Sequence, residues 1–197
     1  MSGKRAYVQV ARAHQSEESH SRIVDKVVEL LRDVGQLNDI TLERVADRAD
    51  TTVRTILRHF GSRDALLEAA FLQVHEATIK ARTAISADGI EDGLAALMRS
   101  YEADGDLAIR GLAQEAQHPA LQAAFERARA EHWAWLDRLF GQSINHLGPS
   151  AREQRLTELY AATDIYIWKL LRRDLLLGPD ETAATVRRMV RAIIAQN

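Results

Sequence analysis

The stretch Thr41–Phe60, TLERVADRADTTVRTILRHF, contains two short helical segments separated by Ala49-Asp50-Thr51. Successive residues of an α-helix are about 100° apart, so the second segment places its apolar side chains on one face and its polar side chains opposite. The apolar set is Val53, Ile56, Leu57 and Phe60, and the polar set is Arg54, Thr55, Arg58 and His59. Because so short a helix is not stable alone, its apolar face is expected to dock on neighbouring helices.

The polar face of this segment is basic and has no acidic partner nearby. No Asp or Glu lies between Asp50 and Asp64, and Arg54 and Arg58 are four residues apart, where like charges repel. A helix about 10–12 Å across fits the major groove of B-DNA, and arginine binds phosphates and guanine edges. The charge pattern alone equally allows a solvated basic face on an ordinary bundle helix.

The rest of the chain predicts an all-α protein. Apolar residues recur three and four positions apart, no stretch alternates at period two, and the three prolines, Pro119, Pro149 and Pro179, are far apart. Besides the two short segments, helices are expected at about 19–34, 64–84, 90–103, 106–117, 119–146, 150–177 and 180–196, which makes about nine in all. Thr41, Thr52 and Ser62 are expected to be N-caps, and residues 1–18 a flexible arm.

Composition excludes several classes of protein. The 197 residues include no cysteine, which rules out disulfide scaffolds and thiolate sites and is compatible with a cytoplasmic location. No apolar run approaches the ~20 residues that cross a bilayer, so no membrane partner is expected. The net charge of −2 argues against indiscriminate coating of nucleic acid; residues 1–65 carry eleven Lys and Arg against ten Asp and Glu, a local net of +1.

Three short helices, with the second and third joined by a tight turn, form a helix-turn-helix unit. Here the unit resembles the TetR family of bacterial transcriptional repressors. The matching residues are Arg22-Ile23, Gly35, TLERVADRA at 41–49, Thr52, Thr55 and HFGSRDALL at 59–67. Two residues depart from the family pattern: Asp50 replaces the usual Gly of the turn, and Leu57 replaces an aromatic residue whose hydroxyl meets a phosphate. Aspartate adopts positive φ more easily than most residues, so the turn is expected to form.

The resemblance implies a DNA-binding domain at 19–65 whose partner is a palindromic duplex operator. Arg54 and Thr55 are the candidates for base-edge contacts. The residues expected to contact phosphates are Thr41, Thr52, Arg58, His59 and Arg63, the last together with the free N–H groups of the following helix. In the arm, Lys4, Arg5 and Arg12 are candidates to follow the DNA backbone or enter the minor groove, with simple disorder as the alternative.

The resemblance also implies that residues 66–197 bind a small-molecule effector and form a homodimer. Candidate dimer residues lie on two apolar stripes: Leu156, Leu159, Tyr160, Thr163, Ile167, Leu170, Leu171, Val186, Met189, Val190 and Ile193. Candidate pocket residues are the bulky and polar side chains of the middle helices: Phe71, His75, Met98, Tyr101, Gln114, His118, Phe125, His132, Trp133 and Trp168. For both sets the alternative is ordinary intramolecular packing. Trp133 and Trp135 are two residues apart, so at most one of them points fully inward.

Signs of enzymatic chemistry are poor, and no cofactor or metal is expected. Glu115 and His118 have the spacing of a di-iron ligand pair, but no second copy exists and Pro119 ends the helix. No glycine-rich phosphate loop or nucleophile motif occurs. The leading prediction is a repressor released from its operator by a ligand. The alternatives are a regulator that answers to a protein partner, and a helical enzyme or carrier whose first helices are only structural.

Overall fold

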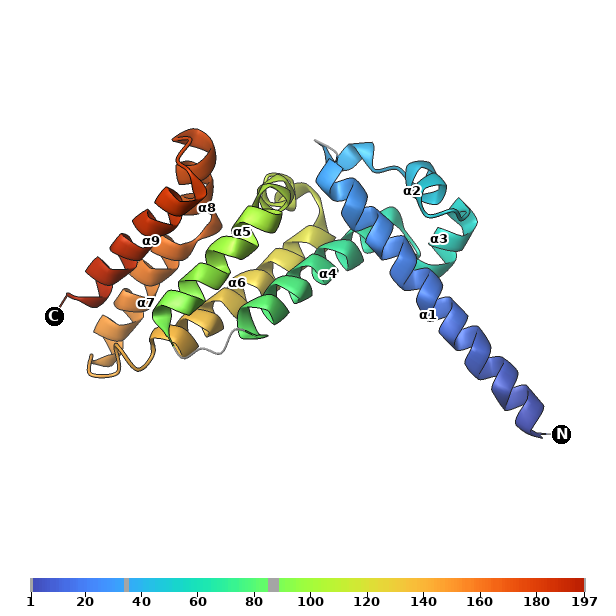
Figure 1. The fold of residues 1–197 in the computed structure, drawn as a ribbon. Helices are drawn as coiled ribbons and strands as arrows, with labels where there is room; N and C mark the ends of the chain where they lie inside the picture. Colours follow the sequence, from blue (N-terminus) through green and yellow to red (C-terminus); the bar gives the residue numbers. More distant parts are fainter. Residues whose placement is uncertain (1, 34–35, 85–88, 197) are drawn as a thin grey trace. The chain divides into compact units, whose positions relative to one another are not determined.

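The computed structural model describes residues 2–33, 36–84 and 89–196 of the chain, and this part is entirely helical, as the sequence predicted (Figure 1). The nine α-helices of these ranges are α1 (Ser2–Asp33), α2 (Leu42–Arg48), α3 (Val53–Phe60), α4 (Arg63–Ala84), α5 (Ile90–Leu112), α6 (Pro119–Phe140), α7 (Pro149–Thr163), α8 (Ile165–Lys169) and α9 (Pro179–Ile194). Short 3-10 turns, η1 (Leu37–Asp39) and η2 (Glu115–Gln117), precede α2 and α6, and a π-helical turn, η3 (Leu170–Asp174), continues α8.

The chain divides into two compact units, residues 1–74 and 75–197, with the division inside α4. In the first unit, α1, α2, α3 and the beginning of α4 enclose one small core. Ile56 of α3 is fully buried there, and burying such a side chain contributes about 1.5–3 kcal/mol. Its buried companions are Ile23, Val27, Leu30, Leu31, Val45, Leu66, Leu67 and Ala70. This core holds α3, which is too short to persist by itself.

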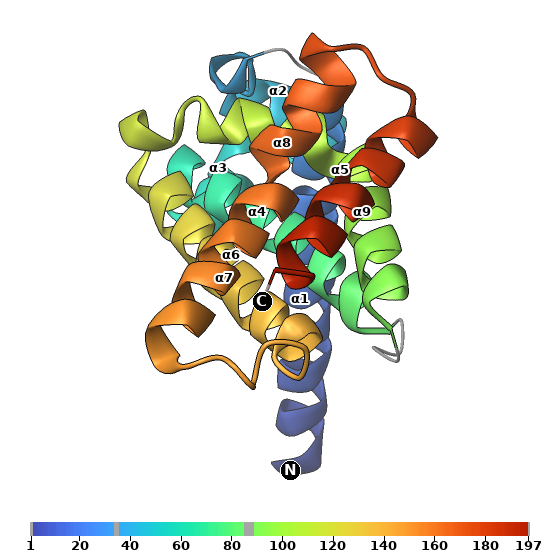
Figure 2. The ribbon, with the colours of Figure 1, turned by 90° about the vertical axis from the view of Figure 1, so that its left-hand side faces the viewer.

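The second unit is a helical bundle in which α5 packs against α6, α8 and α9, and α7 packs against α6 and α9 (Figure 2). Its apolar core includes Leu97, Leu136, Phe140, Leu159 and Val190, all of them fully buried. Trp168 of α8 is the largest side chain in this core and is 1% exposed. The bundle therefore has a well-filled interior of its own.

Three local features differ from the sequence-based expectations. Residues 2–18 were expected to form a flexible arm, but they are the first part of α1; no Gly or Pro occurs from Lys4 to Asp33, so nothing stops the helix. Gly105, expected to break a helix, lies inside α5, where a Cβ atom would come within 2.5 Å of the Trp168 ring. Conversely, the expected helix 150–177 is divided at Asp164, whose carboxylate accepts the backbone N–H of Tyr166 at 2.9 Å and caps α8.

Candidate DNA-binding site

The turn between α2 and α3 has the conformation that the sequence predicted. Asp50 has φ +46°, the left-handed region in which an aspartate is tolerated better than most residues. Backbone hydrogen bonds close the turn: the N–H of Ala49 donates to Val45 O at 2.9 Å and that of Thr51 to Ala46 O at 3.0 Å. The aspartate therefore replaces the usual glycine without disrupting the helix-turn-helix.

Three hydroxyl side chains cap the helices of the first unit, as predicted. Thr41 accepts the backbone N–H of Arg44 at 3.2 Å, and Thr52 accepts that of Thr55 at the same distance. Ser62 accepts the N–H of Ala65 at 3.1 Å at the start of α4. Each cap satisfies one of the free N–H groups of a helix end and contributes about 1 kcal/mol. Thr41 and Thr52 are exposed, so they also remain accessible to a phosphate.

The two faces of α3 differ in burial, with one departure from the expected pattern. Ile56 is buried and Val53 and Phe60 are half-buried, but Leu57, expected on the docking face, is 40% exposed. On the helix, Leu57 lies at the edge of the apolar arc, about 60° from Arg54. The outer surface of α3 thus presents an aliphatic side chain beside Arg54.

Arg54 and Arg58 are exposed, and neither forms a hydrogen bond or an ion pair with any residue in the described ranges. Other arginines of the first unit are engaged. Arg48 of α2 binds Asp33 at 3.0 Å, and Arg44 donates to Asp39 O at 3.3 Å. The two α3 guanidinium groups are therefore available to a ligand from outside.

Arg63 has a different role from the phosphate contact that the sequence suggested. Its Nε donates to the carbonyl of Ile40 at 2.6 Å, and its Nη2 donates to the carbonyl of Leu37. Its side chain is only 26% exposed. These bonds tie the start of α4 to the segment between α1 and α2, so Arg63 stabilises the unit and is not placed at the surface of α3.

His59 lies half-buried between α3 and α1. The ring of His20 stacks on Phe60 with centroids 4.4 Å apart and meets His59 edge-on at 6.1 Å. Burial, reinforced by the nearby charge of Arg58 and by His20, lowers the pKa of His59 below its ordinary value. Near neutral pH this side chain is therefore neutral, and a phosphate contact from it would be an uncharged hydrogen bond.

The candidate pocket residues of the second unit lie in several different environments. Met98, Tyr101, His132 and Trp168 are buried in the core. Their polar groups have protein partners: Tyr101 Oη donates to Thr163 O at 3.0 Å, His132 Nε2 lies 3.0 Å from Thr163 Oγ1, and Trp168 Nε1 donates to Glu102 at 2.8 Å. These contacts are the ones expected if the four residues serve ordinary intramolecular packing.

The remaining candidates have other environments. Phe71 belongs to the first unit. His75 lies 3.0 Å from Glu131, Gln114 donates to Arg110 O at 3.1 Å, and His118 is the residue before α6. Phe125 is half-buried on α6.

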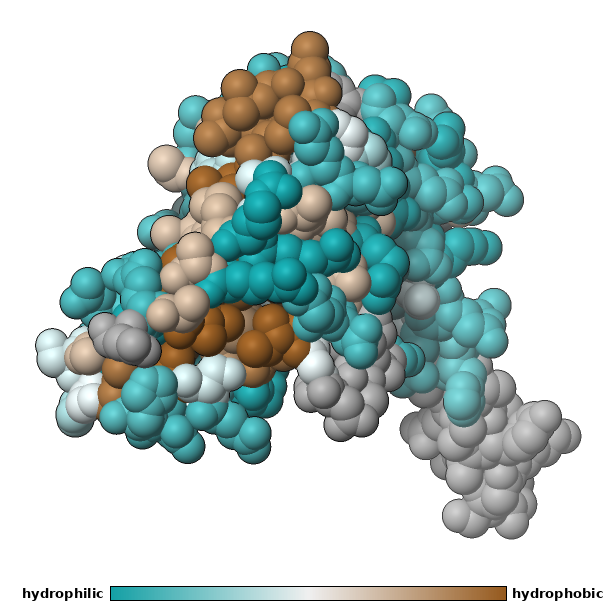
Figure 3. Space-filling view, turned by 60° about the vertical axis from the view of Figure 1, so that its left-hand side comes forward, coloured by the Kyte–Doolittle hydropathy of each residue, from teal (hydrophilic) through white to brown (hydrophobic). Residues whose placement is uncertain are grey.

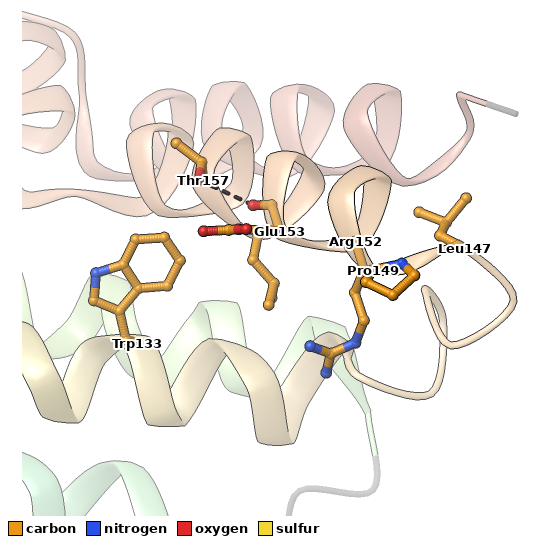
Figure 4. A pocket seen from close by; sticks show the side chains of 7 residues that line it. Trp133, Leu147, Pro149, Arg152, Glu153 and Thr157 are labelled. Atoms are coloured by element: carbon orange, nitrogen blue, oxygen red, sulfur yellow. Dashed lines mark hydrogen bonds between the residues drawn. The ribbon is translucent and has the colours of Figure 1, made fainter.

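Trp133, another candidate for the pocket, points away from the core of the bundle. It is 38% exposed, whereas Trp135 is 6% exposed and faces the core. Trp133 stacks on Tyr160 at 4.7 Å and lines an open groove of about 600 Å³ on α6 and α7 (Figure 4). Leu147, Pro149, Arg152, Glu153, Leu156 and Thr157 complete the lining.

Most of the candidate dimer residues are used inside the protomer. Leu156, Leu159, Thr163, Leu171, Val186 and Val190 are buried, and Tyr160, Ile167, Met189 and Ile193 are half-buried against the same core; Leu170 is exposed. The stripes predicted from periodicity are thus mainly intramolecular faces.

Of the apolar side chains that are most exposed on α8 and just after it, sequence periodicity had placed Leu170 on a candidate dimer stripe but had not identified Tyr166 or Leu176. Tyr166, Leu170, Leu175 and Leu176 are 55%, 43%, 58% and 80% exposed, and Leu176 has φ +58°, a rare conformation for an aliphatic residue. Figure 3 shows apolar residues gathered at the end of the bundle where Figures 1 and 2 place the end of α8. We call these four residues the α8 patch.

No described helix is long and apolar enough to cross a membrane. Within the same ranges, no three His, Asp or Glu residues come together where a metal ion could be held.

The helix α3 is docked by one face, capped by Thr52, preceded by a tight turn and free on its basic face. This arrangement defines a helix-turn-helix DNA-binding protein. Residues 23–70 match the family model of the bacterial regulatory proteins of the tetR family. The helix-turn-helix unit of this chain is therefore that of the TetR family of bacterial transcriptional regulators.

Solved structures extend the likeness in fold to nearly the whole chain. A putative transcriptional regulator from Pseudomonas aeruginosa PAO1 is 15% identical with a TM-score of 0.72, covering 91% of each chain. A putative TetR-family regulator from Mesorhizobium loti is 17% identical with a TM-score of 0.65, covering 91% of this chain and 96% of that one. The multidrug binding protein EbrR, complexed with imidazole, is 18% identical with a TM-score of 0.60, covering 86% and 93%. No curated protein matches the chain in sequence.

Proposed function

We propose that this regulator is a homodimeric repressor that a small molecule releases from a twofold-symmetric operator. The observation that carries the DNA-reading part is the outer face of α3, where Arg54 and Arg58 have no partner among the described residues. Arg54, at the start of α3, is assigned to a base edge together with Thr55. Thr41, Thr52, Arg58 and His59 are assigned to phosphates, and Arg63 is left out because its guanidinium holds the protein's own carbonyls.

The second unit supplies support for a dimer. One helix-turn-helix binds DNA weakly, and two of them separated by one helical turn, about 34–36 Å, give useful specificity. The α8 patch is a group of exposed apolar side chains of the kind that marks a protein interface. We assign this patch to contact with a second copy, together with the outer face of α7 that carries the groove of Trp133.

Release by a small molecule is supported by one of the similar solved structures. The EbrR structure shares the fold and is described as a multidrug binding protein. A ligand that prefers one arrangement of the helices shifts the population of the whole dimer, and such coupling is typically ~1–3 kcal/mol. A regulator of the same fold that answers to a protein partner is the alternative.

A selection of genomic DNA fragments by the purified protein tests this function in stages. Enrichment of fragments that share an inverted repeat is the expected result, and loss of the complex on adding a small molecule identifies release by a ligand. Enrichment of single half-sites would contradict the dimer, and absence of any enriched duplex would contradict DNA reading. If DNA is bound but only a protein fraction releases it, the alternative regulator is correct.

The dimer has its own test, which does not need an operator. Sedimentation of the wild type is expected to show a dimer, and Leu170→Glu or Leu176→Glu is expected to shift it toward the monomer with the helical content unchanged. Leu57→Glu is the matched control for Leu170→Glu, because Leu57 is 40% exposed against 43% for Leu170 but lies on α3. A dimer that persists in both patch variants would remove the α8 patch from the interface.

A further inference from the structure

Leu57 is an aliphatic residue on the outer, basic face of α3. The exposed side chains of this helix are Arg54, Leu57 and Arg58. The leucine is 40% exposed, whereas Ile56 before it is fully buried. A single exposed leucine is common at a protein surface, so its exposure alone carries no inference. Its position does, because the other two exposed residues of α3 are the arginines that have no partner in the described ranges.

The geometry of α3 places Leu57 next to the arginine that is assigned to a base edge. At 100° per residue, Leu57 lies about 60° from Arg54, on the side away from Arg58. Along the helix axis Leu57 is about 4.5 Å beyond Arg54, at 1.5 Å per residue. Successive base pairs of a duplex are about 3.4 Å apart. If Arg54 contacts a base edge, Leu57 therefore lies against a base one or two pairs further along.

The chemistry of leucine restricts what it can contact in the major groove. Its side chain has no hydrogen-bond donor or acceptor, so it cannot bond to a phosphate or to a polar base edge. Covering such an edge would remove the polar groups of the base from water without replacing their hydrogen bonds, which costs free energy. Thymine is the base that presents an apolar group in the major groove, the methyl group on C5, and apolar side chains contact it there.

We propose that Leu57 recognises a thymine of the operator by apolar contact with its C5 methyl group. The inference rests on the proposed DNA-reading function and deepens it by adding a base-specific contact to those of Arg54 and Thr55. Leu57 is thereby a specificity-determining residue that selects one base, and it adds no charge to the interface.

Replacement of thymine by deoxyuridine isolates this contact, because the two bases differ only in the C5 methyl group and pair with adenine in the same way. In the operator selected from genomic DNA, each symmetric pair of thymines is replaced in turn, and fluorescence anisotropy measures the affinity. At one position in each half-site the wild type is expected to lose about fourfold per methyl group, or about fifteenfold for the symmetric pair, from the free energy of burying one methyl group. This position is expected one or two base pairs from the one where Arg54→Ala relaxes base preference.

Variants of Leu57 assign the effect to this side chain. Leu57→Ala is expected to bind the thymine and deoxyuridine duplexes equally, because alanine does not reach the methyl group. Leu57→Met keeps an apolar side chain of similar volume and is expected to retain a preference for thymine. Arg54→Ala is the matched control on the same helix face. It is expected to weaken binding to both duplexes by the same factor and so to keep the wild-type ratio.

Cytosine and 5-methylcytosine give a second readout at the same position. When the sensitive thymine is replaced by cytosine, the methyl group and the pattern of polar groups both change. Methylation of that cytosine restores the methyl group alone, and it is expected to raise the affinity of the wild type about fourfold per half-site. The affinity of Leu57→Ala is expected to stay the same. An equal gain in the two proteins would overturn the contact.

The outcomes also separate this inference from the proposed function. If Arg54→Ala relaxes base preference but no deoxyuridine effect depends on Leu57, DNA reading stands and the methyl contact is overturned. If the deoxyuridine effect persists in Leu57→Ala, another residue contacts the methyl group and the inference is again overturned. If the wild-type protein selects no duplex at all, the proposed function fails and the contact fails with it.

Discussion

The arginines of α3 and those around η3 have opposite environments. Arg54 and Arg58 of α3 have no carboxylate partner in the described ranges. In the second unit, Arg172 makes two hydrogen bonds to Glu102, at 2.7 and 3.0 Å, and Arg173 makes two to Asp106, both at 2.8 Å. The paired arginines fasten the η3 turn to α5, whereas the unpaired ones are available to a charged partner. The same residue type thus has a structural role around η3, whereas on α3 it is left available for the proposed DNA contact.

The ion pairs of Arg172 and Arg173 lie around Trp168. A substitution of this tryptophan is therefore expected to have the largest effect on the stability of the second unit. The Trp168 ring packs on Gly105, lies 4.7 Å beneath the Arg173 guanidinium and donates to Glu102. Trp168→Ala is expected to lower the free energy of unfolding by about 3–5 kcal/mol, because it leaves a cavity in a filled core. Chemical denaturation followed by circular dichroism measures the change.

The matched control for this substitution is Trp133→Ala. Trp133 is 38% exposed, against 1% for Trp168, so less of its surface is buried in the folded protein. Its removal is expected to change stability far less than the removal of Trp168. Equal losses in the two variants would show that burial of the indole in the core is not what fastens α8.

On the binding side of the contrast, Arg54→Ala and Arg58→Ala are expected to leave stability within about 0.5 kcal/mol of the wild type. Arg54→Ala is expected to relax base preference at one operator position by ~1–3 kcal/mol. Arg58→Ala is expected to weaken binding to all sequences and to lower the salt slope by about one unit. Fluorescence anisotropy with the selected operator and single-base variants measures both effects. If the base preference and the salt slope were unchanged in the two variants, the assignment of α3 to the DNA contact would be wrong.

The paired arginines also predict how the second unit responds to acid. Hydrogen bonding from Arg172 lowers the pKa of Glu102 below its ordinary value of 4.5, and the hydrogen bond from Trp168 acts in the same direction. A carboxyl whose pKa is depressed by folding stabilises the folded state above its unfolded pKa, and this stability is lost as the pH falls through the folded pKa. The midpoint temperature of thermal unfolding of the wild type is therefore expected to fall as the pH is lowered below about 4.5. The Arg172→Gln variant is expected to show a smaller fall over the same pH range. An identical pH dependence in the two proteins would contradict the pairing.

The sequence predicted the first unit better than the surfaces of the second, for a physical reason. Caps at Thr41, Thr52 and Ser62 and the turn at Asp50 depend on residues that are neighbours in the chain, so local chemistry was sufficient. Arg63 was misassigned because its partners, Leu37 and Ile40, lie 26 and 23 residues away. A basic residue near a helix start has the same sequence pattern whether it holds a carbonyl or a phosphate.

Periodicity in the second unit identified which residues share a face but not what that face meets. Leu159 and Val190 are on apolar stripes and are buried within the protomer, whereas Leu170 is on the same stripe as Leu159 and is 43% exposed. A stripe has the same spacing in a core and in an interface. The orientation of Trp133 and Trp135 likewise depended on the packing of α6 against α7, which spacing alone does not give.

The smallest expected effect concerns Asp50, which links the local turn to the free face of α3. Its φ of +46° is accessible to glycine at no steric cost and is mildly unfavourable for aspartate. Asp50→Gly is therefore expected to change the free energy of unfolding by less than about 1 kcal/mol, since relief of strain opposes the greater freedom of the unfolded chain. Asp50→Val is expected to be clearly destabilising, because a β-branched side chain tolerates this conformation poorly. If the valine variant were as stable as the wild type, the turn would have to adopt another conformation, and α3 would no longer present Arg54 and Arg58 as described.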